Sequence, residues 1–196
     1  MNKIKFFYGL SGTFKTVTIN SEKKLQPISP VVWSMIKHWK DLESGLFLDD
    51  VEKNHLNFAL LHLCILGNEL KSQEGKDGVT IFSERGVSDP LFYYEKLDNK
   101  KIVSIVEYEK ELCNTYLPNC EIEKILLIQE DKKFIEDIVL KEPHRKSIFP
   151  DVESYIKRQN EYVDFTRKYN NITKVIKIDN AKEYLESLGL TFKKEG

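Results

Sequence analysis

Cysteine, glycine and proline are scarce in this chain, with three, nine and six residues among 196. The cysteines, Cys64, Cys113 and Cys120, are odd in number and form no C-x-x-C pair, which argues against a disulfide framework and against a zinc site. No Pro- or Gly-rich linker, internal repeat or low-complexity tract divides the sequence. We therefore expect one domain that spans residues 1–196.

An excess of one charge and long apolar runs are also absent. Thirty basic and thirty-one acidic side chains give a net charge of −1, so the chain has no bulk attraction for nucleic acid or for anionic membranes. The longest interior apolar run, residues 58–67, is too short to span a bilayer. The N-terminal MNKIKFFYGL has a short apolar run and no cleavage site, which indicates a first strand and not a signal peptide. We expect a cytoplasmic protein that does not enter membranes.

Short apolar runs alternate with helical patterns along the sequence. Strands are expected at residues 4–8, 28–32, 79–83, 125–129 and 175–178. Helices are expected from residue 14 or 15 onward and at 33–39, 50–72, 90 onward, 103–116, 134–140, 152–169 and 181–188. This alternation predicts an α/β fold of three layers, α/β/α, with a parallel sheet of about five strands. In such sheets, ligands bind at the carboxyl ends of the strands.

The first strand runs directly into Gly9-Leu10-Ser11-Gly12-Thr13-Phe14-Lys15-Thr16. This stretch follows the Walker A pattern G-x-x-x-x-G-K-[ST] except at one position. Successive backbone N–H groups before a helix N-terminus form a cradle for anions. Lys15 would reach the β- and γ-phosphates of ATP or GTP, and the Thr16 hydroxyl would bind Mg²⁺.

The departure from the pattern is Phe14, which stands where glycine is expected. A Cβ and a ring at this position crowd the loop or change its backbone angles. Gly12 is an additional glycine that supplies some of the missing freedom. A Gly-Ser turn that happens to precede Lys-Thr, or a degenerate loop that no longer binds nucleotide, are the alternatives.

A charged pair, Glu84-Arg85, follows the strand at 79–83 and precedes Gly86-Val87-Ser88-Asp89. A carboxylate at this edge can hold Mg²⁺ through water or orient an acceptor hydroxyl, and an arginine can neutralise phosphate charge. An exposed ion pair in a loop is the alternative. Together with the Walker A pattern, the stretch resembles the deoxynucleoside kinase and thymidylate kinase superfamily, whose corresponding strand ends in Glu-Arg-Ser or Asp-Arg-Tyr.

The resemblance implies a kinase that uses ATP (or GTP) and Mg²⁺ to phosphorylate a nucleoside or a nucleoside monophosphate. Glu84 and Arg85 would organise the metal and the acceptor. A basic lid at about residues 141–151 would close over the phosphates, with Arg145 as its arginine and Arg158 as a further candidate. The other basic lid residues are Lys141, His144 and Lys146. A solvated basic loop is the alternative.

The resemblance also implies that the turn at Asp179 and Asn180 lines the adenine pocket, although either residue could simply cap the following helix. The general base of the deoxynucleoside kinases, in a Glu-Pro-Val stretch, is missing, because this chain has Ser29-Pro30-Val31. Thymidylate kinases place an aspartate in the loop where this chain has Ser11. Substitute bases remain open among four acidic residues: Asp41, Glu43, Asp49 and Asp50.

Two other functions stay open at this point. One is a kinase acting on nucleic acid, at a polynucleotide end or a modified base, and the other is a nucleotide-binding protein without catalysis. A homodimer also stays open. A metal site at His55 and His62 is not expected, because no third ligand is evident. Aromatic residues in such positions belong to the core more often than they stack on a base. Phe92 and Tyr93 are the better stacking candidates here, and the others are Trp33, Trp39 and Tyr94.

Overall fold

The computed structural model describes residues 1–23, 51–93 and 97–190. In these ranges four strands form one parallel sheet: β1 (Lys3–Tyr8), β2 (Thr80–Glu84), β3 (Glu121–Gln129) and β4 (Lys174–Ile178). Their order is β2-β1-β3-β4, so β1 lies between β2 and β3. The strand expected at 28–32 and the helix expected at 33–39 lie outside the described residues.

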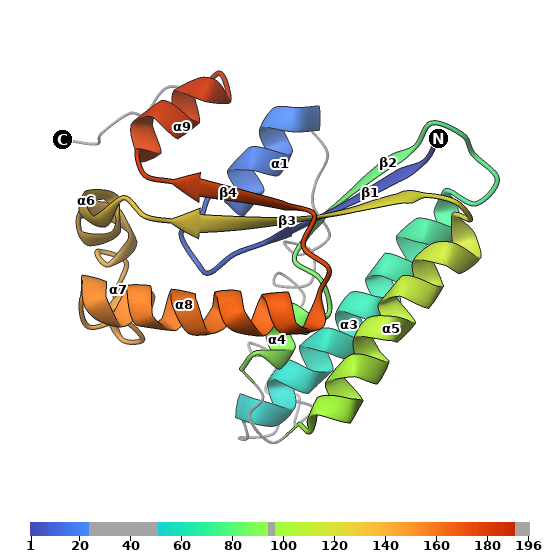
Figure 1. Ribbon diagram of the computed structural model, residues 1–196, viewed down its shortest axis with the longest axis horizontal. Helices are drawn as coiled ribbons and strands as arrows, with labels where there is room; N and C mark the ends of the chain where they lie inside the picture. Colours follow the sequence, from blue (N-terminus) through green and yellow to red (C-terminus); the bar gives the residue numbers. More distant parts are fainter. Residues whose placement is uncertain (24–50, 94–96, 191–196) are drawn as a thin grey trace, which may run out of the picture.

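Helices cover both faces of this sheet, as Figure 1 shows: α1 and α9 lie on one face, and α3, α5 and α8 on the other. The described helices are α1 (Lys15–Lys23), α3 (Val51–Ser72), α4 (Ser88–Leu91), α5 (Asn99–Tyr116), α6 (Lys132–Phe134), the π-helical η1 (Ile135–Val139), α7 (Pro143–Lys146), α8 (Val152–Tyr169) and α9 (Ala181–Ser187). The expected α/β class, with a parallel sheet between helices, is therefore confirmed.

The central strand β1 is apolar throughout its second half because both of its faces are covered. Ile4, Phe6 and Tyr8 join the larger core cluster, which includes residues of α3, α5 and α8. Phe7 points the other way and packs with Ile19 of α1. This alternation follows from the two-residue period of a strand.

Several expected boundaries differ from the observed ones by one to four residues; α5, for example, begins at Asn99 and not at 103. β3 begins at Glu121 and not at 125, because its charged first half pairs with β1 at the amino ends of the two strands, where Lys3 Nζ lies 2.6 Å from Glu121 Oε2. The helix expected at 134–140 begins at Lys132, where Asp131 caps it by accepting from Phe134 N, and it continues as a π-helical turn.

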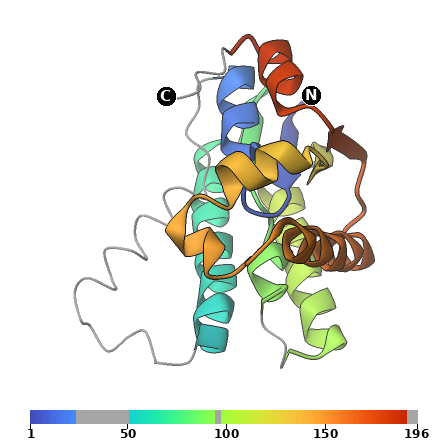
Figure 2. The ribbon, with the colours of Figure 1, turned by 90° about the vertical axis from the view of Figure 1, so that its left-hand side faces the viewer.

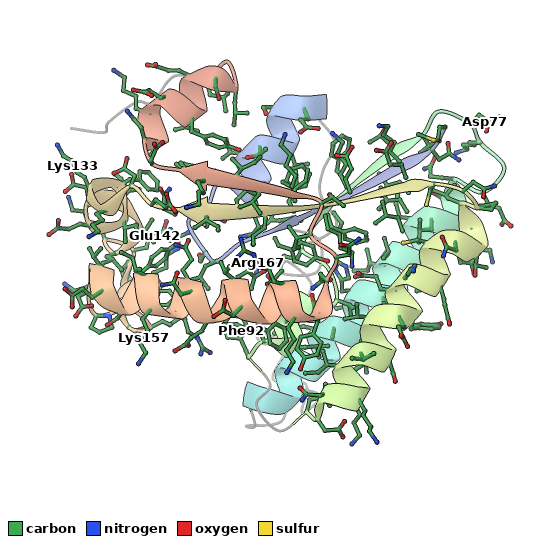
Figure 3. All side chains as sticks on the ribbon, in the orientation of Figure 1. Asp77, Phe92, Lys133, Glu142, Lys157 and Arg167 are labelled. Atoms are coloured by element: carbon green, nitrogen blue, oxygen red, sulfur yellow. The ribbon has the colours of Figure 1, made fainter. Side chains whose placement is uncertain are left out.

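The carboxyl ends of the strands meet at one edge of the sheet, which faces the viewer in Figure 2. Lys133, Glu142 and Lys157 lie toward this edge in Figure 3, whereas Asp77 lies in the turn at the opposite end. None of the helices in the described ranges combines the length and apolar composition that a membrane span requires. Because ligands bind at the carboxyl ends of parallel strands, the loops at this edge are where the expected site residues are sought.

Candidate functional site

The loop between β1 and α1, with the first residues of α1, is called the glycine loop (residues 9–16). Gly9 and Gly12 have φ angles of 152° and 92°, which glycine adopts readily. A Cβ on Gly9 would lie 2.8 Å from the carbonyl oxygen of Leu127, and a Cβ on Gly12 would lie 2.8 Å from Val139 Cγ2. Both backbone angles and packing therefore require glycine at these two positions.

Phe14 stands where the Walker A pattern has glycine, and its backbone is left-handed, with φ of 59°. For a residue with a side chain this conformation costs about 1–2 kcal/mol. The ring packs against Phe134 and Tyr184, with centroid distances of 4.8 and 5.9 Å. Aromatic packing thus holds Phe14 in the backbone conformation that a glycine would adopt without strain.

Lys15 turns back into the glycine loop. Its Nζ donates to the carbonyl oxygens of Gly9 and Leu10 at 2.7 and 3.0 Å. The side chain is buried, and burial, followed by the positive charge of Arg85, lowers the pKa of Lys15 to about 7. Because an anion would stabilise the charged ammonium, this position favours an anionic ligand.

Thr16, in the first turn of α1, meets the end of β2. Its hydroxyl donates to Glu84 Oε2 at 2.5 Å, and Glu84 is buried. A hydroxyl beside a carboxylate can hold Mg²⁺ together with water and phosphate oxygens. The described residues contain no group of three or more His, Cys, Asp or Glu side chains that could hold a metal ion by themselves. A metal at Thr16 and Glu84 would thus need further ligands from water or from a bound phosphate.

A cavity of about 270 Å³ opens over the glycine loop. Beyond the loop its lining includes Glu84, Arg85 and Arg145, so together with Lys15 three basic side chains and one carboxylate line it. The Nε atoms of Arg85 and Arg145 are buried and have no hydrogen-bond partner among the described residues. Because both guanidinium groups carry a positive charge and line the cavity, an anionic ligand is favoured there.

Arg85 is not part of an exposed ion pair, which was the alternative interpretation of the Glu84-Arg85 stretch. Its guanidinium pairs with Asp89, and the two side chains are only 17% and 2% exposed. The backbone at Arg85 is left-handed, with φ of 88°. The hydroxyl of Ser83 donates to the Arg85 carbonyl at 2.7 Å, and Arg85 N donates to the carbonyl of Phe7 at 2.9 Å.

The expected lid contributes one residue to the cavity, Arg145 of α7, whose guanidinium also lies 3.1 Å from Glu142. Lys141 is on the surface, 3.7 Å from Asp137. Arg158 lies elsewhere, with its guanidinium 4.2 Å from the ring centre of Phe92. The structure therefore brings Arg145 to the glycine loop but neither Lys141 nor Arg158, and the side chain of His144 lies outside the described part.

The expected adenine turn adjoins a second cavity of about 280 Å³ between the segment 131–138 and the start of α9. Phe134 lines both this cavity and the one over the glycine loop. Asn180 lines it and also caps α9, accepting from Lys182 N and Glu183 N. Asp179 is exposed and does not line the cavity. Asn180 thus caps α9 and lines a cavity, whereas Asp179 does not line it, and the adenine pocket stays a prediction.

Two tyrosines of α8 were not identified from the sequence. Tyr155 donates to the carbonyl of Ser11 at 2.8 Å, and the Tyr162 hydroxyl accepts from Gly9 N at 3.2 Å and donates to Asp89. They are seven residues apart, which places them on one face of the helix. That spacing on an amphipathic helix was the available signal, but it does not say which loop the face contacts.

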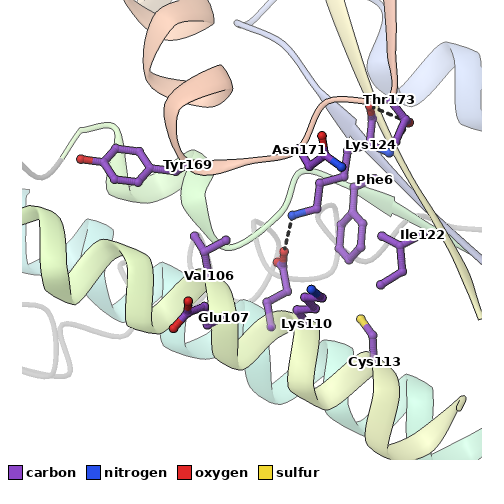
Figure 4. A pocket seen from close by; sticks show the side chains of 11 residues that line it. Phe6, Val106, Glu107, Lys110, Cys113, Ile122, Lys124, Tyr169, Asn171 and Thr173 are labelled. Carbon is purple, nitrogen blue, oxygen red and sulfur yellow. Dashed lines mark hydrogen bonds and ion pairs between the residues drawn. The ribbon is translucent and has the colours of Figure 1, made fainter. Parts of the chain in front are cut away.

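Figure 4 shows a third cavity, of about 290 Å³, lined by residues of β1, α5, β3, the end of α8 and the segment before β4. Lys124 Nζ lies there 3.6 Å from Glu109 Oε1. The other oxygen of Glu109 accepts from Val87 N at 2.5 Å and lies 3.7 Å from His62 Nε2. The buried carboxylate thus holds the turn that follows Arg85, and none of the expected site residues lines this cavity.

Two of the aromatic residues considered for base stacking lie in the described part of the chain. Phe92 is half-buried and packs edge-to-face against Tyr162 and Phe165. The Arg158 guanidinium covers its ring, so Phe92 packs against the core. Tyr93 contacts Phe92 at 4.9 Å between ring centres. Trp33, Trp39 and Tyr94 lie outside the described residues.

Comparisons with protein-family models, with curated proteins and with solved structures found no match to this chain. The motifs and the geometry of the site are therefore the observations from which a function can be inferred.

Proposed function

We propose that the chain is a P-loop phosphotransferase, related to the deoxynucleoside and thymidylate kinases, that moves the γ-phosphate of ATP or GTP onto a nucleoside or a nucleoside monophosphate. The observation that carries the proposal is the convergence of Lys15, Arg85 and Arg145 on one cavity over the glycine loop. Two of these side chains have a buried N–H without a partner in the described part of the chain. A polyphosphate has the charge and the acceptor oxygens to bind all three.

Each residue has a role in this scheme. Lys15 and the amides of the glycine loop bind the β- and γ-phosphates. Thr16 and Glu84 hold Mg²⁺, which neutralises phosphate charge when it is bound. Arg145, on the short helix α7, stabilises charge on the transferred group, and Arg85 binds on the acceptor side.

The second cavity fits the base of the same nucleotide. It shares Phe134 with the phosphate cavity, so a base and a polyphosphate joined by a ribose could lie across this ring. Asn180 offers polar contacts, and Phe134 and Ile138 offer an apolar surface. This is the usual composition of a small-molecule site.

The chemical nature of the acceptor depends on a base. Among the described residues that line the phosphate cavity, the carboxylate is Glu84, and its oxygen accepts from Thr16. A nucleoside acceptor needs a general base, for which Asp41, Glu43, Asp49 and Asp50 lie outside the described residues. A monophosphate acceptor needs none, because its oxygen is already ionised. A cytoplasmic location, where such acceptors occur, belongs to the proposal.

The direct test is ATP and GTP consumption with a panel of nucleosides, nucleoside monophosphates and oligonucleotides. We expect turnover with at least one small acceptor and none with Lys15→Ala, whereas the exposed-surface control Lys101→Ala stays active. Turnover with oligonucleotides alone would select a kinase of nucleic acid. Nucleotide binding without turnover would select a non-catalytic protein, and neither binding nor turnover would refute the proposal.

A further inference from the structure

A chain of hydrogen bonds joins the glycine loop to Arg85. Gly9 N donates to the Tyr162 hydroxyl at 3.2 Å, this hydroxyl donates to Asp89 Oδ1, and Asp89 Oδ2 accepts from the Arg85 guanidinium. The carbonyl of Gly9 accepts from Lys15 Nζ at 2.7 Å. The two cations that face the same cavity are thus connected through one backbone residue, one tyrosine and one aspartate.

The side chains that link the two cations are buried. Tyr162 is 0% exposed and Asp89 is 3% exposed, so water does not compete for these bonds. A tyrosine hydroxyl has one proton; because it goes to Asp89, the oxygen is left to accept from Gly9 N. Burial, followed by the charge of Asp89, raises the pKa of Tyr162 well above its ordinary value, so the proton stays on the hydroxyl.

Only the two ends of this hydrogen-bond chain lie at the cavity. Arg85 and Lys15 line the cavity, whereas Tyr162 and Asp89 do not. A ligand in the cavity can therefore touch the two cations but not the groups that link them. Moreover, the left-handed backbone of Arg85 is a conformation that persists only where contacts on several sides hold it. A shift of the Arg85 side chain would change the pairing of Asp89 and, through Tyr162, the position of Gly9.

We propose that Tyr162 and Asp89 couple the two ends of the site, so that binding at Arg85 changes the affinity of the glycine loop for nucleotide. The coupling rests on the proposed function in one respect, namely that the loop binds nucleotide. Coupling of this kind is reciprocal, so nucleotide in the loop changes the affinity at Arg85 by the same factor. Tyr162 is a positioning residue in this scheme and does not contact either ligand.

The same helix offers a matched control. Tyr155 is also buried, also extends from α8 and also bonds to the glycine loop, through the carbonyl of Ser11. Tyr155→Phe removes one α8–loop hydrogen bond and leaves the Gly9–Tyr162–Asp89–Arg85 chain in place. Tyr162→Phe removes the same atom type from the chain itself, so the two variants separate coupling from packing.

The first experiment measures the dissociation constant of Mg·ADP by titration calorimetry in a double-mutant cycle. Tyr162→Phe and Asp89→Asn should each weaken binding about fivefold, the typical effect of one hydrogen bond. The combined variant should also show about fivefold, because both changes break the same chain. Tyr155→Phe should also weaken binding about fivefold, through its own bond to the Ser11 carbonyl, and combined with Asp89→Asn the two effects should multiply to about twenty-five-fold. Multiplication in the Tyr162→Phe cycle, or no effect of Asp89→Asn, would overturn the coupling.

The second experiment needs no ligand and measures hydrogen exchange of the Gly9 amide by NMR. Asp89→Asn should speed this exchange about tenfold although Asp89 does not touch Gly9, and Tyr155→Phe should leave it unchanged. An unchanged exchange rate of the Gly9 amide in Asp89→Asn would overturn the coupling. If circular dichroism shows that Asp89→Asn does not fold, Arg85→Lys takes its place in the same measurement. If the wild type binds no Mg·ADP, the proposed function fails. The exchange rate of the Gly9 amide still decides whether a change at Asp89 reaches Gly9 through Tyr162.

Discussion

Replacing Phe14 by glycine and by alanine should reverse the usual order of stability of these two residues. At an ordinary position alanine is the more stable by about 0.5–1 kcal/mol, because glycine loses more backbone freedom on folding. Phe14 has φ of 59°, and there a residue with a Cβ bears a cost of about 1–2 kcal/mol that glycine does not. The balance favours Phe14→Gly over Phe14→Ala by about 0.5–1 kcal/mol.

Both variants should be less stable than the wild type. Each loses the contacts of the ring with Phe134 and Tyr184, and removal of a fully buried phenylalanine side chain costs about 3–5 kcal/mol. Phe14 is only half-buried, so about 2 kcal/mol is expected for Phe14→Ala. Relative to one another, Phe14→Gly should melt about 2 °C above Phe14→Ala.

Thermal unfolding by calorimetry measures this difference, and Phe165 provides the matched control. Phe165 is also half-buried and also packs against two aromatic rings, but it lies within α8. There the alanine variant should melt above the glycine variant, because glycine is the poorer helix former by about 1 kcal/mol. The same order at both positions would refute the strained backbone at Phe14.

Two further predictions concern metal and pH. Glu84→Gln keeps a partner for the Thr16 hydroxyl but loses the charge, so the Mg²⁺ concentration for half-maximal ATP turnover should rise about tenfold or more; an unchanged Mg²⁺ requirement would contradict the metal role. Burial lowers the pKa of His62 despite the opposing charge of Glu109, while Lys124 pairs with that carboxylate. The unfolded chain therefore takes up a proton at His62 at higher pH than the folded chain, so stability is lost as pH falls below about 6.5. The melting temperature of His62→Gln should fall less than that of the wild type between about pH 7 and about pH 5, and parallel curves would contradict this.

Local sequence features predicted much of the fold. The apolar run before Gly9 indicated β1, and the amphipathic pattern at 152–169 indicated α8, which has these bounds in the structure. There Asp151 caps the helix by accepting from Ser154 N. The charged start of β3 was missed, since Glu121 shows no apolar period and pairs instead with Lys3. The charges at the start of β3 are paired with a neighbouring strand, and the sequence of β3 alone does not show that pairing.

The candidate site was likewise predictable from the sequence only in part. The glycine loop, Glu84, Arg85 and Arg145 were expected from short motifs, and the structure brings them to one cavity. Whether they bind nucleotide stays a prediction. Tyr155 and Tyr162 were not expected, because they meet the loop from 144 and 153 residues away in the chain. Contacts at such separations depend on the packing of α8 under the sheet, which no local pattern specifies.

The loop conformation was only partly predictable. The sequence left open whether Phe14 distorts the loop. In the structure the backbone of Phe14 is left-handed, and its ring packs against Phe134 and Tyr184. The two partners come from α6 and α9, far from Phe14 in the sequence. Tertiary packing thus supplies what the missing glycine does not.

The central claim is that the glycine loop binds a nucleoside polyphosphate, and titration calorimetry with Mg·ATP tests it most directly. The wild type should bind with one site per chain, and Lys15→Ala, folded by circular dichroism, should bind at least tenfold more weakly, since a charge-assisted bond is worth about 1.5–3 kcal/mol. Equal affinity of the two proteins, or no binding by the wild type, would contradict the account.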